Sequence, residues 1–122
     1  MKAIQQELAE VIRNWIKLLS EDKFDEACKL LDNDTKEQWN EKKLKKIILG
    51  YNKKEHTLNI ENPYEMNLEK ERIVFYEFDD KTGWVVEYDI PMDKQWSDLT
   101  AQFKFRENKG RFDFLLDDIH VL

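Results

Sequence analysis

The sequence predicts an α+β domain in which three N-terminal helices pack on a curved antiparallel sheet of four to five strands. Apolar residues recur at steps of three and four up to about residue 50, and at steps of two after it. Turn-forming residues separate the alternating segments, and three Gly and two Pro in the whole chain leave little room for linkers. With 122 residues, the chain fits one domain spanning 1–122.

The helical period predicts three helices, at 3–19, 22–32 and 35–49. Thr35 and Gln38 have the spacing of a capping box, which is typical of the start of a helix. Gly50 is placed to end the third helix in a left-handed conformation, as glycine often does after a C-cap.

The alternating period predicts a short strand or extended connection at 56–60, followed by strands at 72–78, 84–90, 99–105 and 111–121. The segment 72–78 is apolar on both faces, which favours a central strand covered on each side. The runs Asp80–Gly83 and Asn108–Gly110 are turn signals between neighbouring strands. Helices on one face of this sheet would give both layers an apolar partner.

The net charge of −6 is concentrated in the second half of the chain. Residues 1–50 hold ten basic and ten acidic residues, whereas 51–122 hold ten basic and sixteen acidic ones. The surplus is densest within 77–98, where two lysines accompany seven acids: Glu77, Asp79, Asp80, Glu87, Asp89, Asp93 and Asp98. An acidic half argues against a nucleic-acid partner, because nucleic-acid recognition needs a basic surface.

The remaining reactive residue types form no motif. The lysines within 42–46 are expected on the solvent side of a helix. The lone Cys28 lies in an amphipathic pattern, which favours a small apolar role over a nucleophile. His56 and His120 match no metal-site spacing with it. We therefore expect no metal, no cofactor and no enzymatic activity.

Charged residues interrupt the first apolar pattern at Glu7, Glu10 and Arg13, which argues against a secretory hydrophobic segment there. No run of about 18 apolar residues occurs in the chain. These features predict a cytoplasmic protein without a membrane partner. The oligomeric state stays open, with a homodimer among the alternatives.

Two short stretches resemble a known superfamily: Ser97-Asp98-Leu99-Thr100 and Leu116-Asp117-Asp118-Ile119-His120-Val121-Leu122. Together with the order of helices and strands, they resemble the nuclear transport factor 2-like superfamily, a cone in which a bent sheet wraps around helices. Within it, they are similar to a small, functionally uncharacterised bacterial family that ends in LDDIHVL. The superfamily includes dehydratases and isomerases, whose inward Tyr/Asp/His cluster is not apparent here, and immunity proteins that neutralise toxins.

Asp118 and His120 are the candidates for acid–base chemistry. They are two positions apart on the last strand, so they share one face with Phe112, Phe114 and Leu116, which we expect to point inward. An Asp beside a His at the apolar opening of a cone can shift the pKa of that His so that it acts as a general base. The alternative is that both lie in water beyond the edge of the core.

Trp96 is the candidate anchor of a binding surface. It follows Pro91 in a segment whose sequence predicts a loop. The carboxylates of Asp93 and Asp98 flank it in the sequence. An exposed Trp among acids is a natural binding anchor, although it can also fold back onto the core edge. We therefore expect a non-enzymatic binding protein, for example an immunity-type protein for a basic toxin, with a contact formed by Asp79, Asp80, Asp93, Trp96 and Asp98. The alternative is a small-molecule-binding or acid–base cone that uses Asp118 and His120.

Overall fold

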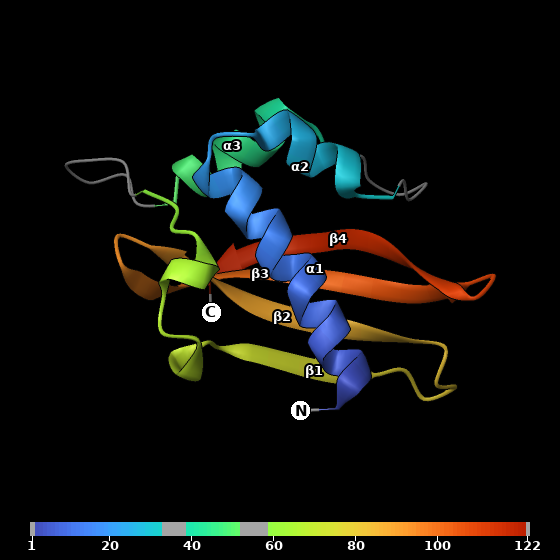
Figure 1. Ribbon diagram of the computed structural model, residues 1–122. Coiled ribbons are helices and arrows are strands. Elements are labelled where there is room, and N and C mark those ends of the chain that lie inside the picture. The colour runs from blue at the N-terminus through green and yellow to red at the C-terminus, as the bar shows by residue number, and fades with distance from the viewer. Residues whose placement is uncertain (1, 33–38, 52–58, 122) are drawn as a thin grey trace.

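A computed structural model describes residues 2–32, 39–51 and 59–121. It has the α+β architecture that the sequence predicts, with helices on one face of a four-stranded antiparallel sheet of order β1-β2-β3-β4 (Figure 1). The elements are α1 (Ala3–Ser20), α2 (Phe24–Leu30), α3 (Glu41–Leu49), the short 3-10 helices η1 (Pro63–Glu65) and η2 (Leu68–Lys70), β1 (Ile73–Glu77), β2 (Gly83–Met92), β3 (Gln95–Asn108) and β4 (Arg111–Val121).

The core forms where α1 crosses the sheet (Figure 1). The stripe of α1 from Leu8 to Leu19 is buried, and Trp15 is fully enclosed. The Trp15 ring meets Phe103 of β3 edge-on at 5.2 Å between ring centroids, and Phe103 stacks on Phe114 of β4 at the same distance. The Trp15 indole N–H donates to the carbonyl of Ala27 at 3.0 Å, which ties α1 to α2. The concave face of the sheet is therefore filled by side chains.

The third helix begins later than the sequence pattern predicts. Its first residue is Glu41, and the Asn40 side chain caps it by accepting the backbone N–H of Lys43 at 2.8 Å. The expected capping box at Thr35 and Gln38 lies outside the described residues. Gly50 ends the helix at φ −84°, so the expected left-handed conformation is wrong.

Two hairpins at opposite ends of the sheet use tight two-residue turns. In the β3–β4 hairpin, Lys109 and Gly110 both have positive φ, which confirms the predicted turn. In the β2–β3 hairpin, Asp93 and Lys94 have φ of 48° and 64°. The sequence predicted a longer loop after Pro91 rather than this tight turn, because neither residue is the Gly or Asn that usually marks one.

The strand 72–78 was expected in the centre of the sheet, and that prediction is wrong. The observed β1 is an edge strand that pairs with β2 alone. Its apolar residues on the face away from the helices are exposed: Val74 is 46% and Tyr76 is 53% accessible. The continuous apolar run therefore does not reflect burial on both faces.

A β-bulge in β4 reverses the alternation of side chains along the last strand. Phe103 pairs with Leu116, but the preceding residue Gln102 pairs with Asp118, so Asp117 is the extra residue. Before the bulge, Phe114 and Leu116 face the core as predicted; after it, Ile119 does. The expected inward orientation of Asp118 and His120 is therefore wrong.

A buried ionic cluster joins α1 to the sheet. Arg13 of α1 donates two hydrogen bonds to the Glu71 carboxylate, at 2.7 and 2.8 Å, and the Tyr88 hydroxyl of β2 donates to the same group at 2.7 Å. The Glu71 side chain is 4% exposed. Tyr64 donates to Glu10 beside this cluster, at 2.5 Å. A buried carboxylate needs such partners, because an unpaired one would be costly.

Truncation of the stacked aromatic rings tests the assignment of the inner face. Phe103→Ala and Phe114→Ala should each lower the free energy of unfolding by about 3–5 kcal/mol, as buried aromatic truncations do. Val74→Ala, on the outer face of β1, should cost less than about 1 kcal/mol. Urea denaturation measures all three. Losses below about 1 kcal/mol for both Phe variants would contradict the assignment.

Alkaline pH should destabilise the fold through its phenols. Burial, helped by the hydrogen bond to Glu10, raises the pKa of Tyr64 to about 12, and burial together with Glu71 raises the pKa of Tyr88. Unfolded phenols titrate near pH 10, so the unfolded chain loses these protons first and stability falls as the pH rises above about 10. Tyr64→Phe/Tyr88→Phe should flatten this fall in urea titrations, whereas exposed Tyr76→Phe should change it less. An unchanged slope in the double variant would argue against this origin.

Candidate functional site

The five residues predicted to form one binding surface lie at opposite ends of the sheet. Asp79 and Asp80 belong to the β1–β2 connection, whereas Asp93, Trp96 and Asp98 lie at or near the β2–β3 turn. The ten-residue strand β2 separates the two ends, which corresponds to about 30 Å. Figure 1 shows the two turns at opposite sides of the molecule. The five residues therefore do not form one contact.

Trp96 lies in β3 and not in a loop. Its ring is half-buried and meets Tyr88 edge-on at 6.0 Å between centroids. The nearby Asp98 carboxylate accepts the Tyr51 hydroxyl, and Asp93 accepts the backbone N–H of Asn59 at 2.8 Å. These contacts make this end of the sheet a packed structure, in which Trp96 closes the edge of the core.

Most acids of the 77–98 stretch are engaged by neighbours. Asp89 is buried, with Thr100 at 2.6 Å and Arg72 at 2.9 Å. Glu87 accepts the Tyr76 hydroxyl, which raises the pKa of that phenol. Within the described part of the chain, Glu77 and Asp79 have no hydrogen-bond or ion-pair partner. The free carboxylates of this stretch therefore lie at the β1–β2 hairpin.

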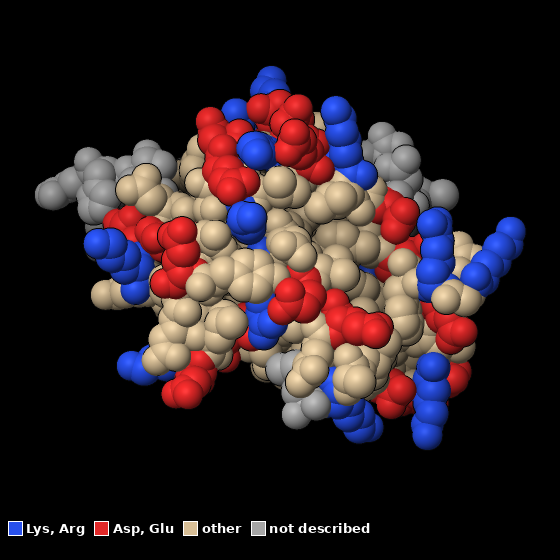
Figure 2. All heavy atoms as spheres, viewed as in Figure 1, with Lys and Arg blue, Asp and Glu red and all other residues tan. Residues whose placement is uncertain are grey.

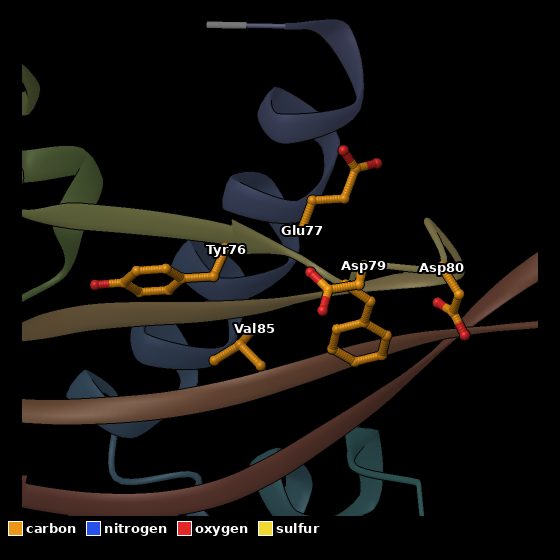
Figure 3. Close-up of a pocket in the computed structure, with 6 residues that line it drawn as sticks. Tyr76, Glu77, Asp79, Asp80 and Val85 are labelled. Atoms are coloured by element: carbon orange, nitrogen blue, oxygen red, sulfur yellow. The ribbon is translucent and has the colours of Figure 1, made fainter.

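A hollow of about 530 Å³ opens at this hairpin, and we call it the hairpin hollow. Its lining residues are Tyr76, Glu77, Phe78, Asp79, Asp80 and Val85. Figure 3 shows Asp79 and Asp80 at the turn, Val85 on the neighbouring strand, and Glu77 directed to the opposite side of the strands. The hollow therefore combines apolar walls with the carboxylates of Asp79 and Asp80, a composition suited to a cationic group on an aliphatic stem.

The hairpin holds its shape through local contacts. The Asp80 carboxylate accepts both the backbone N–H and the hydroxyl of Thr82, at 3.0 and 2.6 Å. These bonds lower the pKa of Asp80, so it stays ionised at neutral pH. Gly83 follows, where a Cβ would lie 2.2 Å from the Phe105 carbonyl oxygen. No larger residue fits this close approach without a backbone shift.

A second hollow, of about 430 Å³, lies at the other end of the molecule. Its lining residues are Glu61, Glu65, Met66, Asn67, Lys70, Lys94 and Trp96. Two lysines oppose two glutamates in this set, so it has no charge surplus. The free carboxylates that were expected around Trp96 therefore lie at the opposite end of β2, at the β1–β2 hairpin.

Asp118 and His120 lie on the face of the sheet away from the helices, because the bulge at Asp117 turns them outward. The His120 ring lies 3.0 Å from Asp118 and 3.9 Å from Glu87. This places an imidazole between two carboxylates on an open surface, outside the apolar interior where we expected it. The pair lines neither of the two hollows described above.

Other candidate reactive groups form no site in the described part of the chain. Burial raises the pKa of the Cys28 thiol, which keeps it protonated and unreactive at neutral pH. No group of three or more His, Cys, Asp and Glu side chains among residues 2–32, 39–51 and 59–121 could hold a metal ion. In these same segments, no helix combines the length and the apolar character needed to cross a membrane.

The face that carries α1 shows no single acidic field. Figure 2 shows acidic and basic side chains interspersed over this view. The net charge of −6 therefore does not form a broad acidic patch on this face. A local arrangement such as the hairpin hollow, rather than an acidic face, is the better candidate for recognition.

A family model described as a domain of unknown function (DUF7668) matches residues 16–122. The chain belongs to this family. The matched range contains all four strands, the hairpin hollow and Glu71, and it begins after Arg13. No curated protein and no solved structure gives a match.

The sequence analysis missed the walls of the hairpin hollow. It assigned Tyr76 and Phe78 to a buried central strand and placed Asp79 and Asp80 in one contact with the distant Trp96. The available signal was the run Glu77-Phe78-Asp79-Asp80, where acids follow an apolar strand directly at a turn. Residues at a turn project beyond the sheet, so this run could have been assigned a contact of its own, separate from Trp96.

Proposed function

We propose that this chain is a non-enzymatic binding protein that holds a basic protein partner at the hairpin hollow. The observation that carries the proposal is the unengaged carboxylate of Asp79, with Asp80 at the same turn, beside the apolar walls formed by Tyr76, Phe78 and Val85. The unengaged Glu77 carboxylate lies at the same end of β1, on the other side of the strands. In its most concrete form, the protein is an immunity-type protein of the cytoplasm that neutralises a basic toxin.

The hollow offers both parts of what a Lys or Arg side chain needs. The aliphatic stem of such a side chain gains by covering apolar surface, and its charged end gains by meeting carboxylates at the rim. Acidic side chains also attract a basic partner from a distance and raise its association rate. An acidic surface of this kind can cover a basic catalytic site and block it without catalysing a reaction itself.

The proposed relationship to the nuclear transport factor 2-like superfamily fits this function. Its support is the order of three helices followed by a sheet whose concave face packs on α1. In this chain Trp15, Phe103 and Phe114 occupy the space where a cone would hold a ligand. A filled interior favours recognition on the outside.

An acid–base role for Asp118 and His120 has less support. Catalysis of this kind gains from a site that excludes water, and this pair lies on the open face of the sheet. We expect His120→Ala and Asp118→Ala to leave binding of a basic partner unchanged, because neither lines the hairpin hollow.

The proposal is tested with variants of equal charge change. Affinity capture from the source cells, followed by mass spectrometry, supplies a basic partner whose binding is then measured with purified proteins. Glu77→Gln/Asp79→Asn/Asp80→Asn should weaken binding at least about tenfold and flatten its dependence on salt. Glu7→Gln/Asp25→Asn/Glu26→Gln removes three exposed helix carboxylates and should leave affinity within about twofold.

Two results would count against the proposal. The first is that the hairpin variant and the helix variant bind the partner equally well. The second is that the captured partner is acidic and binds more tightly as salt is added. Circular dichroism of each variant shows whether it is folded before its affinity is compared.

A further inference from the structure

The outer edge of β1 has backbone groups that point away from the sheet. The Asp89 N–H donates to the Arg72 carbonyl and the Phe78 N–H to the Gly83 carbonyl, so even-numbered residues of β1 bond to β2. In an antiparallel ladder the intervening residues bond outward. The N–H and C=O groups of Ile73, Phe75 and Glu77 therefore face the free side of the strand, which Figure 1 shows at the edge of the sheet.

The opposite edge of the sheet is protected, whereas no backbone hydrogen bond from residues 2–32, 39–51 or 59–121 closes the outer edge of β1. On β4, Asp32 exchanges two hydrogen bonds with Phe114, and the Trp39 indole donates to the Leu116 carbonyl at 2.7 Å. The strand Ile73–Glu77 contains no Pro, no Lys and no register shift against β2. These are among the devices by which proteins usually close an edge strand. Of the others, β1 has only its short length and the charge of Glu77 at its end, so it is able to accept another strand of complementary charge.

The side chains of β1 favour an apolar and basic strand as the occupant. Val74 and Tyr76 stand exposed on the open face, next to the hairpin hollow. Ile73 and Phe75 are half-buried on the helix side, so an added strand could cover both pairs. The carboxylates of Glu77, Asp79 and Asp80 then select positive charge at one end of that strand.

A second copy of this chain is a poorer occupant of the same edge. Antiparallel pairing of two β1 strands would bring residues 70–72 of one copy to the hairpin hollow of the other. Of these, Arg72 is held by Asp89 and by the carbonyls of Trp96 and Ser97, and Glu71 is held by Arg13. Lys70 alone would remain to meet the acids, and each copy carries a net charge of −6.

From this geometry we infer that β1 is a strand-addition site. It takes an extended segment of the partner in antiparallel orientation, with Lys or Arg near the N-terminal end of that segment in the hairpin hollow. This inference rests on the proposed function and specifies how the partner is held. Antiparallel addition continues the pattern of the existing sheet and is the more stable arrangement per residue.

The probe is a fluorescent hexapeptide, acetylated and amidated, with lysine at its first and third positions, threonine at the fifth and valine at the others. In the inferred register its lysines lie opposite Phe78 and Tyr76, and its valines lie opposite Glu77, Phe75 and Ile73. N-methylation at the second and fourth positions removes donors that face β1. N-methylation at the third and fifth positions removes donors that face away, and so serves as the matched control.

Fluorescence anisotropy at low ionic strength should show the unmodified peptide and the control binding alike. Methylation of the donors that face β1 should weaken binding about tenfold or more, since each lost hydrogen bond costs affinity. A peptide with its lysines moved to the fourth and sixth positions should also bind more weakly. In the complex, hydrogen exchange of the Ile73, Phe75 and Glu77 amides should slow, whereas that of Val74 and Tyr76 should change little.

Two protein variants separate the contribution of the outward backbone N–H of β1 from that of the Glu77 carboxylate. Glu77→Gln removes the carboxylate alone, and Glu77→Pro also removes the outward N–H without breaking a bond to β2. The proline variant should bind the peptide more weakly than the glutamine variant. Since the methylated peptides test the same bonds on the unaltered protein, a misfolded proline variant does not affect the outcome.

The outcomes separate the two proposals. Equal binding of both methylated peptides, with loss in Glu77→Gln/Asp79→Asn/Asp80→Asn, would overturn strand addition and leave the acidic hollow as the binding site. Peptide binding that the triple variant does not weaken would overturn both. Sedimentation that shows a dimer of this chain, dissociated by Glu77→Pro, would assign the edge to a second copy and refute the basic segment.

Discussion

Packing of α1 across the concave side of the sheet determines the rest of this structure. Trp15 is fully enclosed and lies against Phe103, so the helix and the two longest strands share one core. The Arg13–Glu71 pair fixes the same helix to the segment that leads into β1. Because protein interiors are close-packed, little space is left inside for a ligand. Recognition by this molecule must then use its edges, its turns or its open face.

The sequence predicted the layers of this fold better than the orientation of its strands. Periodicity located the helices and the four strands, since burial of one face imposes a period of 3.6 or 2 on apolar residues. It could not locate the bulge at Asp117, because Leu115 and Leu116 are both apolar and permit either phase. The spacing of three between Leu116 and Ile119 was the available signal. An extra residue restores Ile119 to the core at the cost of one unpaired position.

The candidate site was predicted in part, for a similar reason. Charge along the sequence correctly marked the stretch from Glu77 to Asp98 as acidic, but distance along an extended strand grows by about 3.3 Å per residue. Acids that are near neighbours in sequence thus separate to opposite ends of β2. Their partners were also hidden, since Arg72 reaches Asp89 and Thr100 lies beside it on β3. Burial and pairing, rather than number, decide which carboxylates remain free to act.

The open edge of β1 explains how a fold with a filled core could bind a partner firmly. Among the described residues the strand is paired with β2 on one side only, which leaves its outward amides available to solvent or to another strand. That exchange gains little for each hydrogen bond, because water already satisfies the groups. In the proposed complex, specificity must then come from side chains, and we propose that the hairpin hollow supplies it at one end of the strand. A basic segment gains from both features at once, whereas an acidic segment that could form the same backbone bonds is repelled by Glu77 and Asp79.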